Sequence, residues 1–199
     1  MSTEFLNTSE TTFVSSALPD TNFSTNPVIH AGTDEAFQNT ISFLRYTFPS
    51  LPVSEVDSAI LQLSIITKTG AALSPVVVNR VTSSLDTDKV TYNTRPSFIP
   101  TASQTDITKD DLYTTVQIDV TELVNQWING TSPNYGLAIT NSDSTTAVGF
   151  GNNEILHEPF YPVLILTYTE ISVSPESSLS TNAGMIMIND VAVDTLTEP

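Results

Sequence analysis

Cysteine is absent from the 199-residue chain. This absence excludes disulfide bonds, thiolate metal sites and a cysteine nucleophile. It leaves the compartment open, because exported proteins can fold without disulfides.

Basic residues are scarce. Lysine and arginine together number 6 against 22 aspartate and glutamate residues, so the formal net charge is −16. Phosphate backbones and anionic lipid headgroups would be repelled by such a surface. The composition therefore argues against binding to nucleic acid and against binding to a membrane surface.

Long apolar runs are also missing. None approaches the roughly 20 residues that a membrane-spanning helix needs, so we expect no membrane insertion. The first residues, MSTEFLNTSETTF, lack a basic segment followed by an apolar stretch. We therefore expect no classical signal peptide.

Short strand-like segments dominate what is present. They are rich in Val, Ile, Thr and aromatic residues and are separated by Pro, Gly, Asn, Asp and Ser. The segments cover residues 12–17, 28–31, 40–48, 60–66, 75–81, 113–120, 135–140, 147–150 and 162–168. Many short strands without long helices between them predict an all-β fold, an antiparallel two-sheet sandwich of jelly-roll type.

One segment, around residues 120–128, has helical spacing instead. Its apolar side chains, among them Leu123 and Trp127, share one helix face. Asp119 and Glu122 fit a capping box, and Gly130 supplies a left-handed stop. We expect this short helix to close one end of the sandwich, with Trp127, Leu123 and Tyr135 in the structural core.

The chain divides into three parts on composition. We expect an N-terminal arm over residues 1–10, the β-sandwich over 11–169, and a Ser/Pro linker with a strand-like tail over 170–199. An apolar strand after a polar spacer is suited to pairing with a neighbouring subunit or to folding back on its own sheet. The candidate residues of this assembly strand are Met185, Ile186, Met187, Ile188, Val191 and Val193.

Several motifs occur in a recognisable order. They are Asp20-Thr21-Asn22-Phe23, Ser42-Phe43-Leu44-Arg45-Tyr46, Val90-Thr91-Tyr92-Asn93-Thr94-Arg95-Pro96, Asp119-Val120-Thr121-Glu122-Leu123-Val124, Asn134-Tyr135-Gly136-Leu137 and Pro162 to Tyr168. With this series the chain resembles the DNRLRE domain, a β-sandwich module related to carbohydrate-binding modules, over residues 11–169. The resemblance implies a β-sandwich and leaves the ligand open.

Catalytic patterns are weak. Neither His30 nor His157 lies in an HExxH motif, and no Gly-x-Ser-x-Gly motif is present. Paired carboxylates such as Asp34 with Glu35, or Glu154 with Glu158, lie in predicted loops, where acidic residues form turns. We therefore expect a protein that is not an enzyme.

Two kinds of ligand have candidate residues. Calcium prefers oxygen ligands, and the loop residues that could supply them are Asp20, Asn22, Asp106, Asp110 and Asp111, although no known calcium-loop spacing is present and solvated turns are the favoured interpretation. No other cofactor is expected. A glycan needs exposed aromatic rings, and the candidates are Phe37, Tyr92, Phe98, Tyr113 and Phe160, most of which are expected to close the sandwich ends. The net charge favours a neutral glycan over an acidic one.

Two functions follow from these features. The first is a non-catalytic structural subunit of an external assembly, such as a virion decoration or fibre, or a spore or cell-surface appendage. In that case the partners are other copies or other structural subunits, and the protein is an oligomer. The alternative is a carbohydrate-binding or adhesion module for a cell-surface glycan. Both place the protein outside the cell or on a particle surface.

Overall fold

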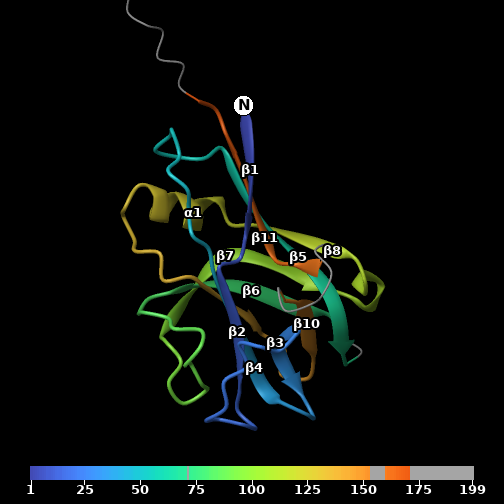
Figure 1. Cartoon of the computed structure of the whole chain (residues 1–199). Helices are drawn as coiled ribbons and strands as arrows, with labels where there is room; N and C mark the ends of the chain where they lie inside the picture. Colours follow the sequence, from blue (N-terminus) through green and yellow to red (C-terminus); the bar gives the residue numbers. More distant parts are fainter. Residues whose placement is uncertain (71, 153–159, 171–199) are drawn as a thin grey trace, which may run out of the picture.

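The computed structural model describes residues 1–70, 72–152 and 160–170. This part of the chain forms eleven β-strands, one α-helix and one 3-10 turn (Figure 1). The strands are β1 (Ser2–Asn7), β2 (Glu10–Ser15), β3 (Val28–Asp34), β4 (Gln38–Arg45), β5 (Ser58–Thr69), β6 (Ser74–Val81), β7 (Phe98–Ile107), β8 (Thr115–Asp119), β9 (Leu137–Asn141), β10 (Ala147–Gly151) and β11 (Val163–Tyr168). The helix is α1 (Thr121–Ile128), and the 3-10 turn is η1 (Lys109–Asp111). Every strand pair is antiparallel, which confirms the predicted sandwich of jelly-roll type with one short α-helix.

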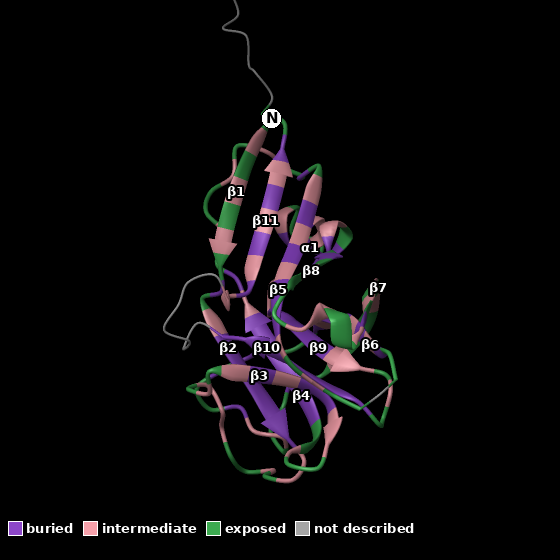
Figure 2. Ribbon diagram, turned by 90° about the vertical axis from the view of Figure 1, so that its right-hand side faces the viewer, coloured by how far each residue is buried: buried purple, intermediate pink, exposed green. Residues whose placement is uncertain are grey.

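Two layers share the long strand β5. Its first half pairs with β11 on one side and β8 on the other, and β1 extends that layer beyond β11. Its second half pairs with β10, and the other layer continues through β3, β4, β9, β6 and β7, with β2 added to β4. Figure 2 shows the two layers one above the other, with β5 passing between them.

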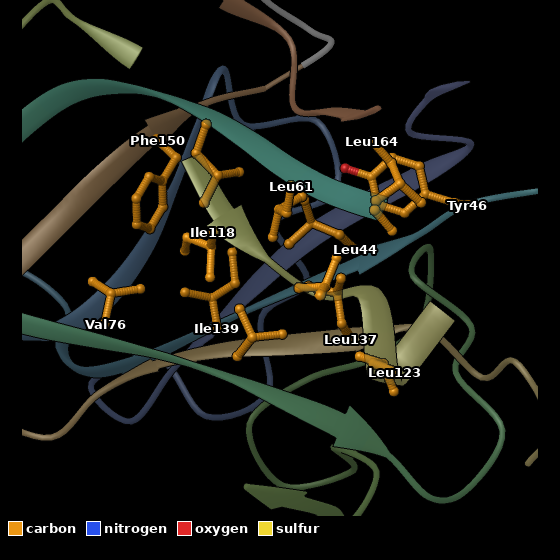
Figure 3. Packing of buried hydrophobic residues seen from close by; sticks show 14 of the residues in the cluster. Leu44, Tyr46, Leu61, Val76, Ile118, Leu123, Leu137, Ile139, Phe150 and Leu164 are labelled. Atoms are coloured by element: carbon orange, nitrogen blue, oxygen red, sulfur yellow. The ribbon is translucent and has the colours of Figure 1, made fainter. Parts of the chain in front are cut away.

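The core lies between the layers. Side chains from every strand from β2 to β11 and from α1 meet there, and most of them are fully buried (Figure 3). They include Leu44 of β4, Leu61 of β5, Ile118 of β8, Leu137 of β9 and Leu164 of β11. Burying one such side chain contributes roughly 1.5–3 kcal/mol, so this cluster is the main source of stability.

The two strands that the sequence did not predict, β1 and β7, are the two ends of the strand order. The expected N-terminal arm, residues 1–10, supplies β1 and the beginning of β2. Along β1, half-buried and exposed residues alternate, and Phe5 is 67% exposed. In β7, polar residues occupy most positions from Thr101 to Asp106. An edge strand buries little surface, so its sequence carries a weak hydrophobic pattern.

The helix begins differently from the prediction. Val120 occupies the N-cap position without a side-chain hydrogen bond, so the predicted Asp119–Glu122 capping box is wrong. The Asp119 carboxylate instead accepts from the Thr121 backbone N–H (2.9 Å) and hydroxyl (2.6 Å). The Thr121 hydroxyl accepts in turn from the Ala59 N–H of β5, which fixes the helix start to the sheet. At the other end, Gly130 has a φ of 75° and ends the helix as expected.

The Asn134-Tyr135-Gly136 motif joins the helix to β9. The Asn134 amide donates to the Tyr46 carbonyl (2.9 Å) and accepts from the Gly136 N–H (3.0 Å). Gly136 has a φ of 98°, and a Cβ there would lie 2.6 Å from the Leu44 carbonyl oxygen. Only glycine fits this position, so the motif is required by the fold.

The predicted core residues lie near this helix. Leu123 and Trp127 are buried, and Tyr135 is half-buried against a second, smaller apolar cluster. Within the described residues, no helix is long and apolar enough to cross a membrane. The linker and the assembly strand lie outside the described residues.

Candidate functional site

The predicted glycan-stacking aromatics are mostly engaged in packing. Phe37, Tyr92, Phe98 and Phe160 are half-buried, whereas Tyr113 is 78% exposed. Phe98 packs edge-on against Phe43 of β4. The Arg95 guanidinium lies 4.0 Å from the Tyr92 ring centroid and covers one face of that ring. These four rings do not form a continuous exposed platform.

Phe37 belongs to an aromatic cluster that we define as Phe13, Phe23, His30 and Phe37. The Phe13 and Phe23 rings stack with centroids 4.3 Å apart, and Phe37 meets both rings edge-on. The ring centroid of His30 lies 5.0 Å from that of Phe13 and 5.2 Å from that of Phe37. Burial lowers the pKa of His30, against an opposing effect of the Asp34 carboxylate. The cluster is therefore an apolar packing unit that holds a neutral imidazole.

The predicted calcium ligands take part in turn hydrogen bonds. Asp20 accepts from the Asn93 amide (2.8 Å), and the Asn22 amide donates to the Thr87 and Val90 carbonyls. Asp111 caps η1 by accepting from the N–H and the hydroxyl of Thr108. Asp110 lies in the same turn, and Asp106 is exposed on β7. The described residues bring no group of three acidic or histidine side chains together for a metal ion.

The remaining predicted ionisable pairs give no reactive centre. His157, Glu154 and Glu158 lie outside the described residues, and Asp34 turns the β3–β4 hairpin by accepting from the Ala36 and Phe37 N–H groups. The assembly strand, Met185 to Val193, also lies outside the described residues.

A groove runs between the edge strand β7 and the helix α1. It consists of two adjoining concavities, of about 330 Å³ and 540 Å³, which share Ala102, Ser103 and Glu122. Residues 99–104 of β7 form one wall, and Arg80 of β6 closes one end. The other wall consists of Asp119, Thr121, Glu122, Leu123 and Gln126. We call this the β7–α1 groove; α1 lies next to β7 in both views (Figure 1 and Figure 2).

A β-bulge lies at the middle of this groove. Three residues of β7 (Thr101, Ala102 and Ser103) lie opposite the single Val78 of β6. The Thr101 hydroxyl stabilises the bulge, since it donates to the Val78 carbonyl (2.7 Å) and accepts from the Ser103 N–H (3.1 Å). Bulges of this kind occur at sheet edges and next to binding sites, where they redirect side chains. Here the bulge displaces the β7 wall where the two concavities join.

The groove lining combines small apolar patches with hydrogen-bonding groups. Ile99 is 45% exposed, and Pro100 and Ala102 are exposed beside it. Across from them, the Gln126 amide donates to the exposed Glu122 carboxylate at 3.4 Å. Arg80 donates to the Ser132 hydroxyl and makes no ion pair with any described residue. The hydroxyl and backbone hydrogen bonds from Thr121 lower the pKa of Asp119, which keeps that carboxylate charged.

A further concavity of about 490 Å³ lies at the β3–β4 hairpin, between Ala36 and Gly70. A smaller one of about 270 Å³ lies beside Trp127, where Phe48 packs edge-on against the indole. The first is lined by short turn side chains and the second by apolar side chains of the 48–53 loop and α1. Of these surfaces, the β7–α1 groove is the one that combines carboxylate, amide, hydroxyl and guanidinium side chains.

The sequence predicted none of the groove residues as a site. Glu122 was predicted only as part of the capping box and Leu123 only as a core residue, and residues 99–104 were not assigned to a strand. The available signal was Pro100, because a proline inside a strand-like run indicates an edge strand or a bulge.

Two comparisons with known proteins bear on this chain. The model of carbohydrate-binding module family 96 matches residues 2–168, which include every strand and the helix. A search among curated proteins finds no match at the required level of similarity.

Proposed function

The chain belongs to carbohydrate-binding module family 96, and from this premise we propose that it is a non-catalytic module that binds a glycan. The family match over residues 2–168 is the observation that carries the proposal. It supports the carbohydrate-binding alternative derived from the sequence, and with it the relation to such modules that the DNRLRE resemblance implied.

The geometry supports binding rather than catalysis. The β7–α1 groove contains amide, hydroxyl and carboxylate groups beside apolar patches, which is the composition of a site that binds a polar ligand. Of the two histidines, His30 is packed among phenylalanine rings, and burial lowers its pKa. Packing against two phenylalanine rings and a lowered pKa suit His30 to a structural role rather than to acid–base catalysis.

The first function expected from the sequence was a structural subunit of a virion, spore or cell-surface assembly. That hypothesis depends on the strand-like tail, which lies outside the described residues, and the family match supports the other function. We therefore propose a glycan-binding module that acts outside the cell, where such ligands occur.

Affinity electrophoresis of the full chain tests this proposal. Gels would contain hydroxyethylcellulose, galactomannan, xyloglucan, polygalacturonate or hyaluronan, with serum albumin as the non-binding control. We expect at least one polysaccharide to retard the chain and no release of reducing ends on long incubation. Equal mobility in every gel would contradict binding, and steady release of reducing ends would contradict the non-catalytic assignment.

A further inference from the structure

We propose that the β7–α1 groove is the glycan site and that its ligand is an uncharged polysaccharide chain. This inference rests on the proposed function and adds a location and a ligand class to it.

The shape of the groove fits a chain rather than a single sugar. Its β7 wall extends over residues 99–104, roughly 15 Å of strand, and the two concavities adjoin along this wall. The bulge at Ala102 lies between them, so one chain can pass from the Arg80 end to the Asp119 end. A pocket for one terminal sugar would be enclosed on more sides.

The two walls offer complementary contacts to a sugar ring. Ile99, Pro100 and Ala102 present exposed apolar surface to the C–H face of a ring. On the opposite wall, Glu122 accepts and Gln126 both donates and accepts, which matches the mixed character of sugar hydroxyls. β7 is an edge strand, so its outer backbone groups add donors and acceptors along the same wall.

The charges of the groove select against an acidic ligand. Asp119 and Glu122 place two carboxylates on the helical wall, against the single guanidinium of Arg80 at the far end. The Asp119 carboxylate already accepts the Thr121 N–H, so the start of the helix is satisfied by an anion of the protein itself. A uronate or sulfate group would meet these carboxylates on a protein of net charge −16.

Tyr113 is the strongest competing location. It is exposed and has a φ of 62°, in the left-handed region that non-glycine residues rarely adopt. It is a single exposed ring, and it lines neither concavity of the β7–α1 groove. We therefore assign the chain-binding role to the groove and use Tyr113 as a test position.

The experiment measures dissociation constants of the full chain by affinity electrophoresis, with the five polysaccharides above and EDTA present. Ala102→Leu fills the middle of the groove, and Gln126→Ala removes one hydrogen-bonding group. The controls are Ala36→Leu, another exposed alanine in a different concavity, and Tyr113→Ala. Thermal unfolding of each variant verifies that it is folded.

We expect a neutral polysaccharide to bind and the two acidic ones not to bind. Ala102→Leu should weaken binding about tenfold. Gln126→Ala should weaken it about fivefold, as for the loss of one hydrogen bond. Both controls should stay within about twofold of the unmodified chain.

Three results would overturn the inference. Unchanged affinity in both groove variants, or a loss confined to Tyr113→Ala or Ala36→Leu, would show that the site is elsewhere while glycan binding stands. Binding to the acidic polysaccharides alone would contradict the ligand class. Binding to none of the five would remove the proposed function and the inference together.

Discussion

The side chains of the aromatic cluster pack against one another, whereas those of the β7–α1 groove line an open surface. The cluster gathers three phenylalanines and a histidine with ring centroids 4.3 to 5.8 Å apart, and Phe13 at its centre is fully buried. The groove contains no aromatic residue among its lining side chains, yet it is open and rich in hydrogen-bonding groups. An aromatic residue therefore indicates a sugar platform only when its ring is exposed. In this protein the rings of the aromatic cluster stabilise the fold, and we expect the ligand to bind at the groove beside the helix.

The largest expected effect separates the two regions by stability. Phe13→Ala should lower the free energy of unfolding by about 3–5 kcal/mol, because it empties the centre of the cluster. Phe5→Ala is the matched control, since Phe5 is 67% exposed on β1 and should change stability by less than about 0.5 kcal/mol. Urea denaturation measures both values. Equal losses in the two variants would contradict the structural role of the cluster.

The second effect concerns pH. Burial lowers the pKa of His30 below its usual value of 6.5, so the unfolded chain takes up a proton at a higher pH than the folded chain does. The contribution of His30 to the free energy of unfolding is therefore fully present above about pH 6.5. It decreases as the pH falls below that value, by at most about 1.4 kcal/mol per pH unit for one proton. Thermal unfolding between about pH 7.5 and pH 5.5 should show this decline, and His30→Phe should flatten it. A decline that persists unchanged in His30→Phe would show that the imidazole is not its source.

The third effect concerns both glycan affinity and stability at the groove wall. Ile99 is 45% exposed on the groove wall, so Ile99→Thr should lower the free energy of unfolding by no more than about 1 kcal/mol. The same change removes apolar contact with the ligand and should weaken glycan binding about threefold. Isothermal titration calorimetry and urea denaturation provide the two numbers. A large stability loss with unchanged affinity would place Ile99 in the core and not in the site.

The smallest effect is expected at Tyr113. Its ring is 78% exposed, so Tyr113→Ala should change the free energy of unfolding by less than about 0.5 kcal/mol. Relief of the left-handed backbone is not expected, because alanine tolerates that conformation as poorly as tyrosine. A stability gain from Tyr113→Gly would show that strain is stored at this position.

The fold was largely predictable because burial leaves a pattern in the sequence. Strands such as β5 alternate buried and less buried residues, and the helix presents Leu123 and Trp127 on one face. The edge strands β1 and β7 were missed because each buries little, so polar residues are tolerated along them. The predicted capping box was wrong because Asp119 lies one residue before the N-cap, Val120. Its carboxylate accepts hydrogen bonds from the N–H and the hydroxyl of Thr121, the first residue of the helix.

The candidate site was harder to predict than the fold. Its members come from β6, β7, the end of β8 and α1, and the sequence shows neither the bulge nor the approach of the helix to the sheet edge. The recognisable motifs indicated scaffold positions, although the motif from Asp119 to Val124 also supplies one wall of the groove. Gly136 is required by its positive φ and its contact with Leu44, and Asp119 and Thr121 attach the helix to β5. Motifs of this kind identify the fold and do not by themselves identify a ligand site.

The most direct test of the account is an NMR titration of the ¹⁵N-labelled full chain. The ligand is an oligosaccharide of the neutral polysaccharide that retards the chain in affinity electrophoresis. The account predicts that backbone amide shifts concentrate on residues 99–104 and on Thr121 to Gln126, while the amides of Phe13, Phe37 and Tyr113 do not move. Shifts centred on the aromatic cluster or on Tyr113, with the groove amides unchanged, would contradict it.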